Sequence, residues 1–199
     1  DLERLSTRLA YGRANARDLV AISECLSRMP KIQSLLSEGN SELLHQSSVN
    51  LDILSEINQL ISERIVDEPP ATIRDGGIFR FGVDNKLDEL REKTGEGTDW
   101  LKQFESQERE KFDIPNLKIK HNRQFGFFIE VTKSHIDKIP EHYRRRQTMT
   151  NAERYTTDEL SSWEEIILTA DDRAKALERE LFIELRNYVS NYSSELSNI

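Results

Sequence analysis

The lysines and arginines between residues 115 and 157 are the side chains in this sequence best suited to binding chemistry. This basic segment holds nine Lys and Arg against four Asp and Glu, a net charge of +5. The other 156 residues hold 19 basic and 32 acidic side chains, a net charge of −13. Because ammonium and guanidinium groups bind phosphate oxygens, an acidic chain that gathers its cations in one place can present one cationic face to a polyanion. The composition therefore predicts phosphate contact by this segment.

Three phenylalanines lie among these cations and allow a second interpretation. Phe125, Phe127 and Phe128 could stack on unpaired bases, as aromatic side chains do in proteins that bind single strands. In the strands of a small sheet, however, such residues more often form the core. We therefore favour a packing role for them.

The basic segment also contains titratable side chains that could be assembled into a metal or acid–base site: His121, His135, Asp137, Glu141 and His142. Their spacings match no ligand template such as H-E-x-x-H. The chain also lacks the nucleotide-binding motif G-x-x-x-x-G-K-[ST], and none of its glycines precedes a lysine. The sequence thus predicts no catalytic residue, no metal site and no ATP hydrolysis by this chain.

Alternating polar and apolar residues predict that the basic segment forms a small antiparallel sheet. The alternation covers residues 117–122 and 127–132, and residues 124–126 can form the turn between them. Residues 133–142 are typical of a loop. Residues 144–156 are predicted to form a further strand or extended segment.

Long helices are predicted on both sides of this sheet. Residues 83–112 keep apolar positions three and four apart through two glycines, although each glycine weakens a helix by up to about 1 kcal/mol relative to alanine. Thr156 and Glu159 form a capping-box pattern at the start of a second helix. This second helix is predicted over 158–198, about 60 Å at 1.5 Å per residue. The two helices must be antiparallel if the sheet is inserted between them.

Residues 1–66 are predicted to form short helices separated by breaks. Pro30 is predicted to end one of them, because proline lacks an N–H group and disfavours helix in the residue before it. Apolar spacing predicts a helical stretch over residues 41–66. Residues 67–82 are rich in Pro and Gly and are predicted to form a loop with room for a short hairpin.

These patterns predict a mainly α fold, α+β overall, with a helical core, two long antiparallel helices and a small inserted antiparallel sheet. The predicted domains are the core with the outgoing helix (1–114), the inserted sheet (115–157) and the returning helix (158–199). Because the sequence begins at Asp1 rather than Met, we expect it to be a piece of a larger protein. No membrane partner is expected, because the apolar runs fall far short of the ~20 residues that span a bilayer. The single cysteine, Cys25, fits a reducing compartment.

Four segments of the sequence resemble the MutS family of DNA mismatch-repair proteins. LKIKHNRQFGFFIEVTK (117–133) is similar to the start of that family's clamp domain, and RRRQTMTNAERYTTDEL (144–160) to the stretch that leaves the clamp. DLERLSTRLAYGRANARDL (1–19) and DEPPATIRDGG (67–77) are similar to the family's core domain, in the same order. The resemblance covers nearly the whole chain and implies the core, lever and clamp portion of such a protein.

The sequence departs from the family pattern at a few clamp positions. Lys120 and His121 stand where a Gly-Tyr pair is usual, Phe127 and Phe128 replace a Tyr pair, and Thr150 stands where a lysine can occur. The fold prediction does not depend on these positions, and they fit a divergent or paralogous member.

The resemblance implies that the clamp contacts the DNA backbone and that the long helices couple this contact to an ATPase domain outside this chain. ATP and Mg²⁺ would bind in that domain, and no cofactor is expected here. The implied partners are duplex DNA, with a mismatch for the whole protein, and a second MutS subunit, in the cytoplasm or nucleoid. Because phosphate contacts carry no sequence information, we expect weak, salt-sensitive binding to any duplex.

The candidate DNA-backbone-binding residues combine the cations of the basic segment with short polar side chains. They are Lys118, Lys120, Asn122, Arg123, Arg144, Arg145, Arg146, Thr150, Asn151 and Arg154. Clustered charges are more often a solvated surface, but their concentration in an acidic chain and the resemblance together favour phosphate contact. Asn151 carries over from the family's NAER motif and could equally be a turn or capping residue.

A coiled-coil interaction module is the alternative function. The apolar seam from Leu160 to Leu196 could pair with another chain without any DNA contact. If the outgoing helix and residues 1–66 cover this seam, a monomer is expected. If they do not, the chain should dimerise through it.

Overall fold

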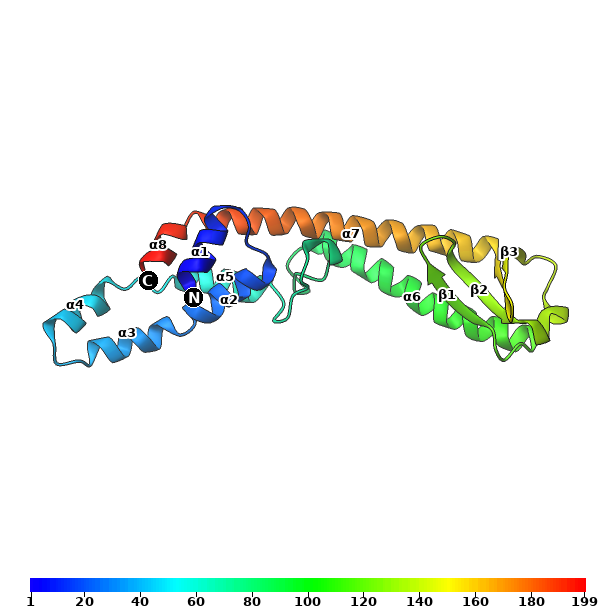
Figure 1. Cartoon of the computed structure of the whole chain (residues 1–199), viewed down its shortest axis with the longest axis horizontal. Coiled ribbons are helices and arrows are strands. Elements are labelled where there is room, and N and C mark those ends of the chain that lie inside the picture. Colours follow the sequence, from blue (N-terminus) through cyan, green and yellow to red (C-terminus); the bar gives the residue numbers. More distant parts are fainter. The chain divides into compact units, whose positions relative to one another are not determined.

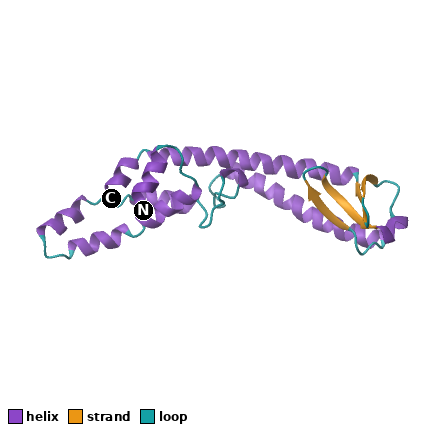
Figure 2. Ribbon diagram, viewed as in Figure 1, coloured by secondary structure: helices purple, strands orange, loops and turns teal.

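The computed structural model describes residues 1–199 and confirms the predicted fold class. The chain is mainly α-helical and contains one four-stranded antiparallel sheet (Figure 2). It divides into two compact units: the sheet unit, Asp88–Arg173, and the helical unit, Asp1–Leu87 with Ala174–Ile199. The predicted domain bounds, which follow elements rather than compactness, remain a prediction. No helix in the structure combines the length and apolarity needed to cross a membrane.

The helical unit is built from short helices and the later part of a long one. It contains α1 (Leu2–Ala10), α2 (Ala16–Leu26), α3 (Met29–Ser37), α4 (Glu42–Asn50), α5 (Ser55–Arg64), the 3₁₀ helix η1 (Ile73–Asp75), α8 (Ser193–Asn198) and the C-terminal part of α7 (Asp158–Ser190). Helix α1 packs against α8, α2 against α5, and α3 against α4 (Figure 1). The fully buried side chains of this unit include Leu9, Leu19, Ile22, Phe182 and Val189.

The segment between α5 and α6 is held to the rest of the helical unit by main-chain contacts. Ile65 and Phe79 form a single isolated antiparallel bridge, and no pair of strands forms within residues 67–82. The Ile78 N–H donates to Glu178 Oε2 over 3.0 Å, and the Glu178 side chain is buried. A buried carboxylate on α7 thus satisfies a buried amide of the loop, as buried polar groups require.

Two helix ends in this unit differ from the prediction. Helix α2 already ends at Leu26, and Pro30 lies in the first turn of α3. Proline is tolerated there because first-turn N–H groups have no intrahelical acceptor, so Pro30 begins a helix rather than ending one. The stretch 41–66 is broken between α4 and α5, where Leu54 has a left-handed φ of 43°.

The long helix α7 is also shorter than predicted. It ends at Ser190 rather than at residue 198, and α8 follows after a turn at residues 191–192. Neither Gly nor Pro marks this break. Leu196 is buried and Ser197 Oγ lies 2.8 Å from Ser6 Oγ, because α8 packs against α1. A tertiary contact has therefore overridden continuation of the helix.

The sheet unit consists of two helices and the inserted strands. It contains almost all of α6 (Asn85–Phe112), the strands β1 (Lys118–Asn122), β2 (Gly126–Thr132), β3 (Arg144–Thr148) and β4 (Ala152–Thr156), the 3₁₀ helix η2 (Lys133–Lys138) and the N-terminal part of α7. Within this unit, α6 and α7 are antiparallel, as predicted: Gly97 faces Ile167, and three residues further along α6, Trp100 stacks on Trp163 at 4.9 Å. A Cβ atom on Gly97 would lie 2.3 Å from Ile167 Cγ1, so the glycine allows the two helices to approach.

The four strands follow the order β1-β2-β4-β3, and all neighbours are antiparallel. The stretch 144–156 is therefore not a single strand but the hairpin β3–β4, which turns at residues 149–151. The Met149 N–H donates to the Ala152 carbonyl over 2.9 Å and closes this turn. The cap of α7 is shifted by one residue from the prediction, since the Leu160 N–H donates to Thr157 Oγ1 over 3.0 Å.

Candidate nucleic-acid interface

The face of the sheet that meets α6 and α7, here called the inner face, is the hydrophobic one. Alternate residues of the strands point to opposite faces, which places Ile119, Ile129, Val131 and Tyr155 together. Ile129, Val131 and Tyr155 are buried in one cluster with residues of both helices, and Ile119 packs against it. This cluster fixes the sheet on its helical support.

Two tyrosines of this cluster donate hydrogen bonds to buried carboxylates. The Tyr143 hydroxyl donates to Glu108 Oε2, and the Tyr155 hydroxyl to Glu153 Oε2, each over 2.5 Å. Burial and the nearby Glu108 carboxylate raise the pKa of Tyr143 far above its usual value. Burial and the Glu153 carboxylate raise the pKa of Tyr155 to about 12. Both phenols therefore stay neutral at physiological pH and act as fixed donors.

The opposite face of the sheet, here called the outer face, carries charged side chains. Lys118, Glu130, Arg154 and Gln147 lie in one row across the four strands, each directly opposite the next in the register. Glu130 Oε1 accepts a hydrogen bond from Lys120 Nζ over 2.6 Å, and its Oε2 accepts one from Arg154 Nε over 3.3 Å. These contacts hold the pKa of Glu130 below its usual value, with the Lys120 hydrogen bond as the largest cause.

Arg154 is held by more than its carboxylate partner. Its Nη1 donates to Gln147 Oε1 over 2.8 Å, and its guanidinium lies over the Phe128 ring, 4.4 Å from the centroid. Phe128 points to the outer face but is only 2% exposed. It is therefore a covered packing residue, as favoured from the sequence, and the half-buried Phe127 packs against the cluster on the inner face.

Several other cations of the basic segment have partners within the chain. Arg144 pairs with Asp158 at the start of α7, Arg145 Nη1 lies 3.7 Å from Glu153 Oε1, and Lys138 Nζ lies 2.5 Å from Asp113 Oδ2. These three cations remain largely or partly exposed. The carboxylate partners of Arg144 and Lys138 are exposed, and exposed ion pairs are weak and screened by salt, so these two cations can exchange their partners. The partner of Arg145, Glu153, is buried.

Four cations of the basic segment have no partner in the structure, and all four are exposed. They are Lys118, Arg123, Lys133 and Arg146. Three of them were predicted as site residues from the sequence, whereas Lys133 was missed. Lys133 follows β2 directly, and its N–H donates to the Asn151 carbonyl over 3.1 Å, which places it beside the β3–β4 turn. The sequence prediction assigned Lys133 to the loop 133–142, and composition alone does not show that it is exposed at the end of a strand.

The structure does not bring all predicted site residues together. Arg123 lies in the β1–β2 turn, three residues before Gly126, where a Cβ atom would lie 1.5 Å from Glu164 Oε1 of α7. Asn151 and Thr150 lie in the β3–β4 turn beyond the other end of β2. With about 3.3 Å per strand residue, the two ends of β2 are roughly 20 Å apart. The candidates therefore form two edges and a central row rather than one cluster.

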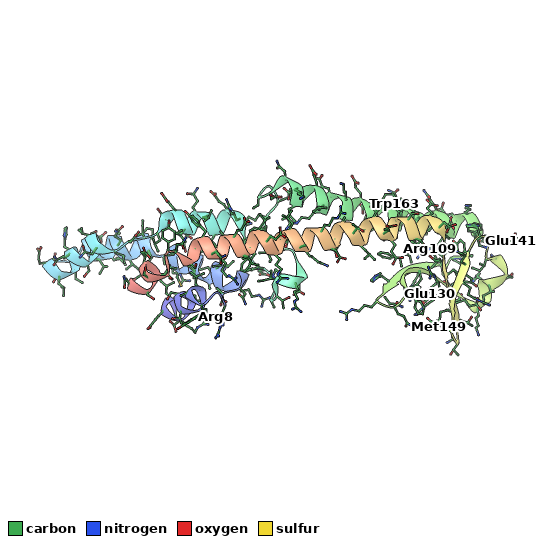
Figure 3. The ribbon with its side chains drawn as sticks, turned by 90° about the horizontal axis from the view of Figure 1, so that it is seen from above. Arg8, Arg109, Glu130, Glu141, Met149 and Trp163 are labelled. Atoms are coloured by element: carbon green, nitrogen blue, oxygen red, sulfur yellow. The ribbon has the colours of Figure 1, made fainter.

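The polar candidates contribute in different ways. Asn122 Oδ1 accepts from the N–H groups of Gln124 and Phe125 over 3.0 and 2.8 Å, which makes it a turn-forming residue. Thr150 and Asn151 are exposed at the tip of their turn. Figure 3 shows Met149, which begins this turn, and Glu130 on the sheet beside the helix that carries Trp163.

The histidines of the basic segment are used in local packing. His121 lies on Phe127 with ring centroids 4.8 Å apart, and His142 contacts Tyr143 at 5.1 Å. His135 Nδ1 lies 2.9 Å from Ser134 Oγ. No group of three or more His, Cys, Asp or Glu side chains in residues 1–199 is placed to hold a metal ion.

These features define a mainly helical protein that carries a small antiparallel sheet, with a cationic outer face, between two long helices. Comparison with known proteins shows which family has this combination of features. The family model described as MutS family domain IV matches residues 82–173, nearly the bounds of the sheet unit. The chain belongs to the MutS family.

Similar relatives extend the match over the whole chain. The DNA mismatch repair protein MutS of Methanococcoides burtonii is 43% identical over 203 residues, which cover 100% of this chain and 23% of the relative. The protein of the same name from Salinibacter ruber is 44% identical over 98% of this chain and 22% of its own length. That of Lachnoclostridium phytofermentans is 45% identical over 96% of this chain and 20% of its own length. The chain thus spans about a fifth to a quarter of these relatives.

Proposed function

We propose that this chain is the core and clamp portion of a DNA mismatch-repair protein and that the outer face and edges of its sheet contact the DNA backbone without sequence specificity. The observation that carries this proposal is the set of four exposed, unpartnered cations on the strands and connecting segments of the sheet, in an otherwise acidic chain. The names of the similar relatives support the repair role. No base-reading helix accompanies these cations, so phosphate contact is the recognition that they fit.

The candidate cations differ in whether they must leave an ion pair within the chain before they can contact a phosphate. Lys118, Lys133 and Arg146 can reach phosphate oxygens without breaking any ion pair. Arg144 can join them by leaving the exposed carboxylate of Asp158, at little cost in stability. The partner of Arg145, Glu153, is buried. Arg154 is held by three partners and has a structural role beneath the contact surface.

In the proposed whole protein, the two long helices connect DNA contact to an ATPase domain that binds ATP and Mg²⁺, and a second subunit completes the grip on the duplex. Helix α7 supports this role, because its 33 residues form one uninterrupted helix that belongs to the sheet unit at its start and to the helical unit at its end. A continuous helix can transmit a rotation as a rigid body.

The alternative, a dimerisation module, finds less support. Its apolar seam is largely covered within a single chain: Leu160, Ile167, Ala170, Ala174, Leu185 and Leu196 are buried. A seam that is already buried offers little area to a second chain. Analytical ultracentrifugation of the 199-residue chain would show a concentration-dependent dimer if this alternative were correct.

The test of the proposed function is DNA binding measured by fluorescence anisotropy. The triple change Lys118/Lys133/Arg146→Gln removes three unpartnered cations from the sheet, and we expect it to weaken binding of a labelled duplex by roughly tenfold or more at low salt. Matched and mismatched duplexes should be bound equally by the wild-type chain, because the contacts are to the backbone.

The matched control changes the same charge elsewhere. Arg4, Arg28 and Lys31 are exposed cations of the helical unit, and their joint replacement by Gln lowers the net charge by the same three units. We expect this control to retain most of the affinity. Equal losses in both triple variants would mean that binding is diffuse attraction rather than contact by the sheet, and would reject the proposal.

A further inference from the structure

Glu130 is the single acidic residue that the strands place on the outer face. The only other acidic strand residue, Glu153, belongs to the inner face, where it is buried beside Tyr155. Glu130 lies at the centre of the row that crosses the sheet, with Lys118 opposite it on one side and Arg154 on the other. A carboxylate in the middle of a cationic surface repels phosphate and lowers the charge available to it.

The two oxygens of Glu130 hold two different cations. Oε1 accepts from Lys120 and Oε2 from Arg154, at 2.6 and 3.3 Å. The side chain of Glu130 is only 20% exposed, so this pairing is less screened than a surface ion pair. Charge-assisted hydrogen bonds of this kind are among the stronger polar contacts in proteins.

The two cations depend on Glu130 to different degrees. Arg154 keeps its hydrogen bond to Gln147 and its contact with Phe128 whether or not Glu130 is charged. Lys120 has no other partner, and its side chain is 47% exposed. Loss of the carboxylate would therefore release Lys120 into solvent while Arg154 stays in place.

We propose that Glu130 limits the DNA affinity of the outer face by holding Lys120 out of phosphate contact. This inference rests on the proposed function, since it assumes that the outer face meets the DNA backbone. Glu130 acts here as a positioning residue, because it touches the cation rather than the nucleic acid. The face then grips DNA with fewer cations than it carries, which keeps the contact weak and readily reversed.

Lys118 and Lys120 provide the matched pair for this inference. Both are exposed lysines of β1 that project from the same face, two residues apart, and only Lys120 is paired with Glu130. Each phosphate contact adds about 0.9 to the slope of log affinity against log salt on duplex DNA. We expect Lys118→Gln to lower that slope by about one and Lys120→Gln to leave it nearly unchanged.

The experiment measures this slope for the 199-residue chain with a labelled matched duplex, between about 50 and 200 mM NaCl. Glu130→Gln is expected to make the slope steeper by about one and to tighten binding about three- to tenfold. Adding Lys120→Gln to this variant should cancel the gain. Far-UV circular dichroism checks that each variant is folded.

The control for charge alone is Glu141→Gln. Glu141 is an exposed carboxylate of the same unit with no partner in the chain, and Figure 3 labels it together with Glu130. Its replacement makes the same change in net charge without freeing a cation, so we expect little change in slope. Equal effects of Glu130→Gln and Glu141→Gln would overturn the inference, and so would a lowered slope for Lys120→Gln, which does not depend on the folding of any Glu130 variant.

The outcomes separate this inference from the proposed function. If the wild-type chain binds with a steep salt dependence and Glu130→Gln changes nothing, only the role of Glu130 is rejected. If neither the wild type nor any variant binds at low salt, both are rejected together.

Discussion

On the inner face of the sheet, carboxylates accept hydrogen bonds from neutral phenols, whereas on the outer face the carboxylate of Glu130 is held by two cations. Both arrangements satisfy carboxylate oxygens, but they serve different ends. The tyrosine pairs stay with the apolar cluster that fixes the sheet to its helices. The ion pairs of Glu130 decide how much positive charge reaches solvent. One face of the sheet therefore sets its stability, and the other, in the proposed function, sets its attraction for an anionic partner.

The sharpest way to break this comparison is to truncate the inner face. Ile129 is fully buried, and Ile129→Ala should lower the free energy of unfolding by about 2 to 5 kcal/mol, because it leaves a cavity in the cluster. Lys118→Ala on the outer face should change that free energy by less than about 0.5 kcal/mol. Urea unfolding followed by circular dichroism compares the two, and similar losses in both variants would contradict the division of roles.

A smaller effect is expected behind the inner face, where α6 approaches α7. Gly97→Ala places a methyl group against Ile167, so we expect a loss of about 1 to 3 kcal/mol despite the better helix propensity of alanine. Gly95→Ala, two residues earlier, meets nothing within 4 Å and should stabilise the protein by up to about 1 kcal/mol. Thermal unfolding of the two variants checks the opposite signs, and a stabilised Gly97→Ala would show that the helices separate easily at this point.

The smallest expected effect depends on pH. Because the pKa of Tyr155 is raised to about 12 in the folded state, its stabilising contribution is complete below the unfolded value near 10 and is lost as the pH rises toward 12. The difference in stability between the wild type and Tyr155→Phe should therefore shrink over that range. Urea unfolding at several alkaline pH values measures it, and a constant difference would argue against the buried phenol–carboxylate pair.

The stabilising contribution of Glu130 should be lost at acidic rather than alkaline pH. Since the pKa of Glu130 is lowered, its contribution is present above the unfolded value near 4.3 and is lost as the pH falls below it. The two faces of the sheet can thus be distinguished by the direction in which pH weakens each of them.

The sequence predicted the elements of this fold better than their ends. The 3.6-residue periodicity of α6 carried through both glycines, because one is exposed and the other is needed where a neighbouring helix approaches. The end of α7 could not be predicted in the same way, since it depends on the contact between α8 and α1, which are far apart in the chain. The β3–β4 hairpin was missed because its turn at residues 149–151 contains neither Gly nor Pro.

The composition predicted which segment carries the candidate interface, but it did not predict which of its cations form ion pairs. Charge counting identified the basic segment, and it treated Lys118 and Lys120 alike. Only the register of the strands brings Glu130 within reach of Lys120 and Arg154, and that register is set by cross-strand packing that the residue list does not contain. Lys133 was not among the predicted candidates, because its position beside the β3–β4 turn depends on a turn that the sequence did not predict.

The stacked indoles of Trp100 and Trp163 are the only tryptophans of the chain, and both belong to the sheet unit. Their emission therefore reports the melting of that unit alone, whereas far-UV ellipticity sums the helices of both units. Denaturation curves recorded with the two signals will coincide if the chain melts as one cooperative body and will separate if it does not. Because α6 and α7 bring both tryptophans together in the sheet unit, the intrinsic fluorescence of the protein can be used to measure whether its two units unfold cooperatively.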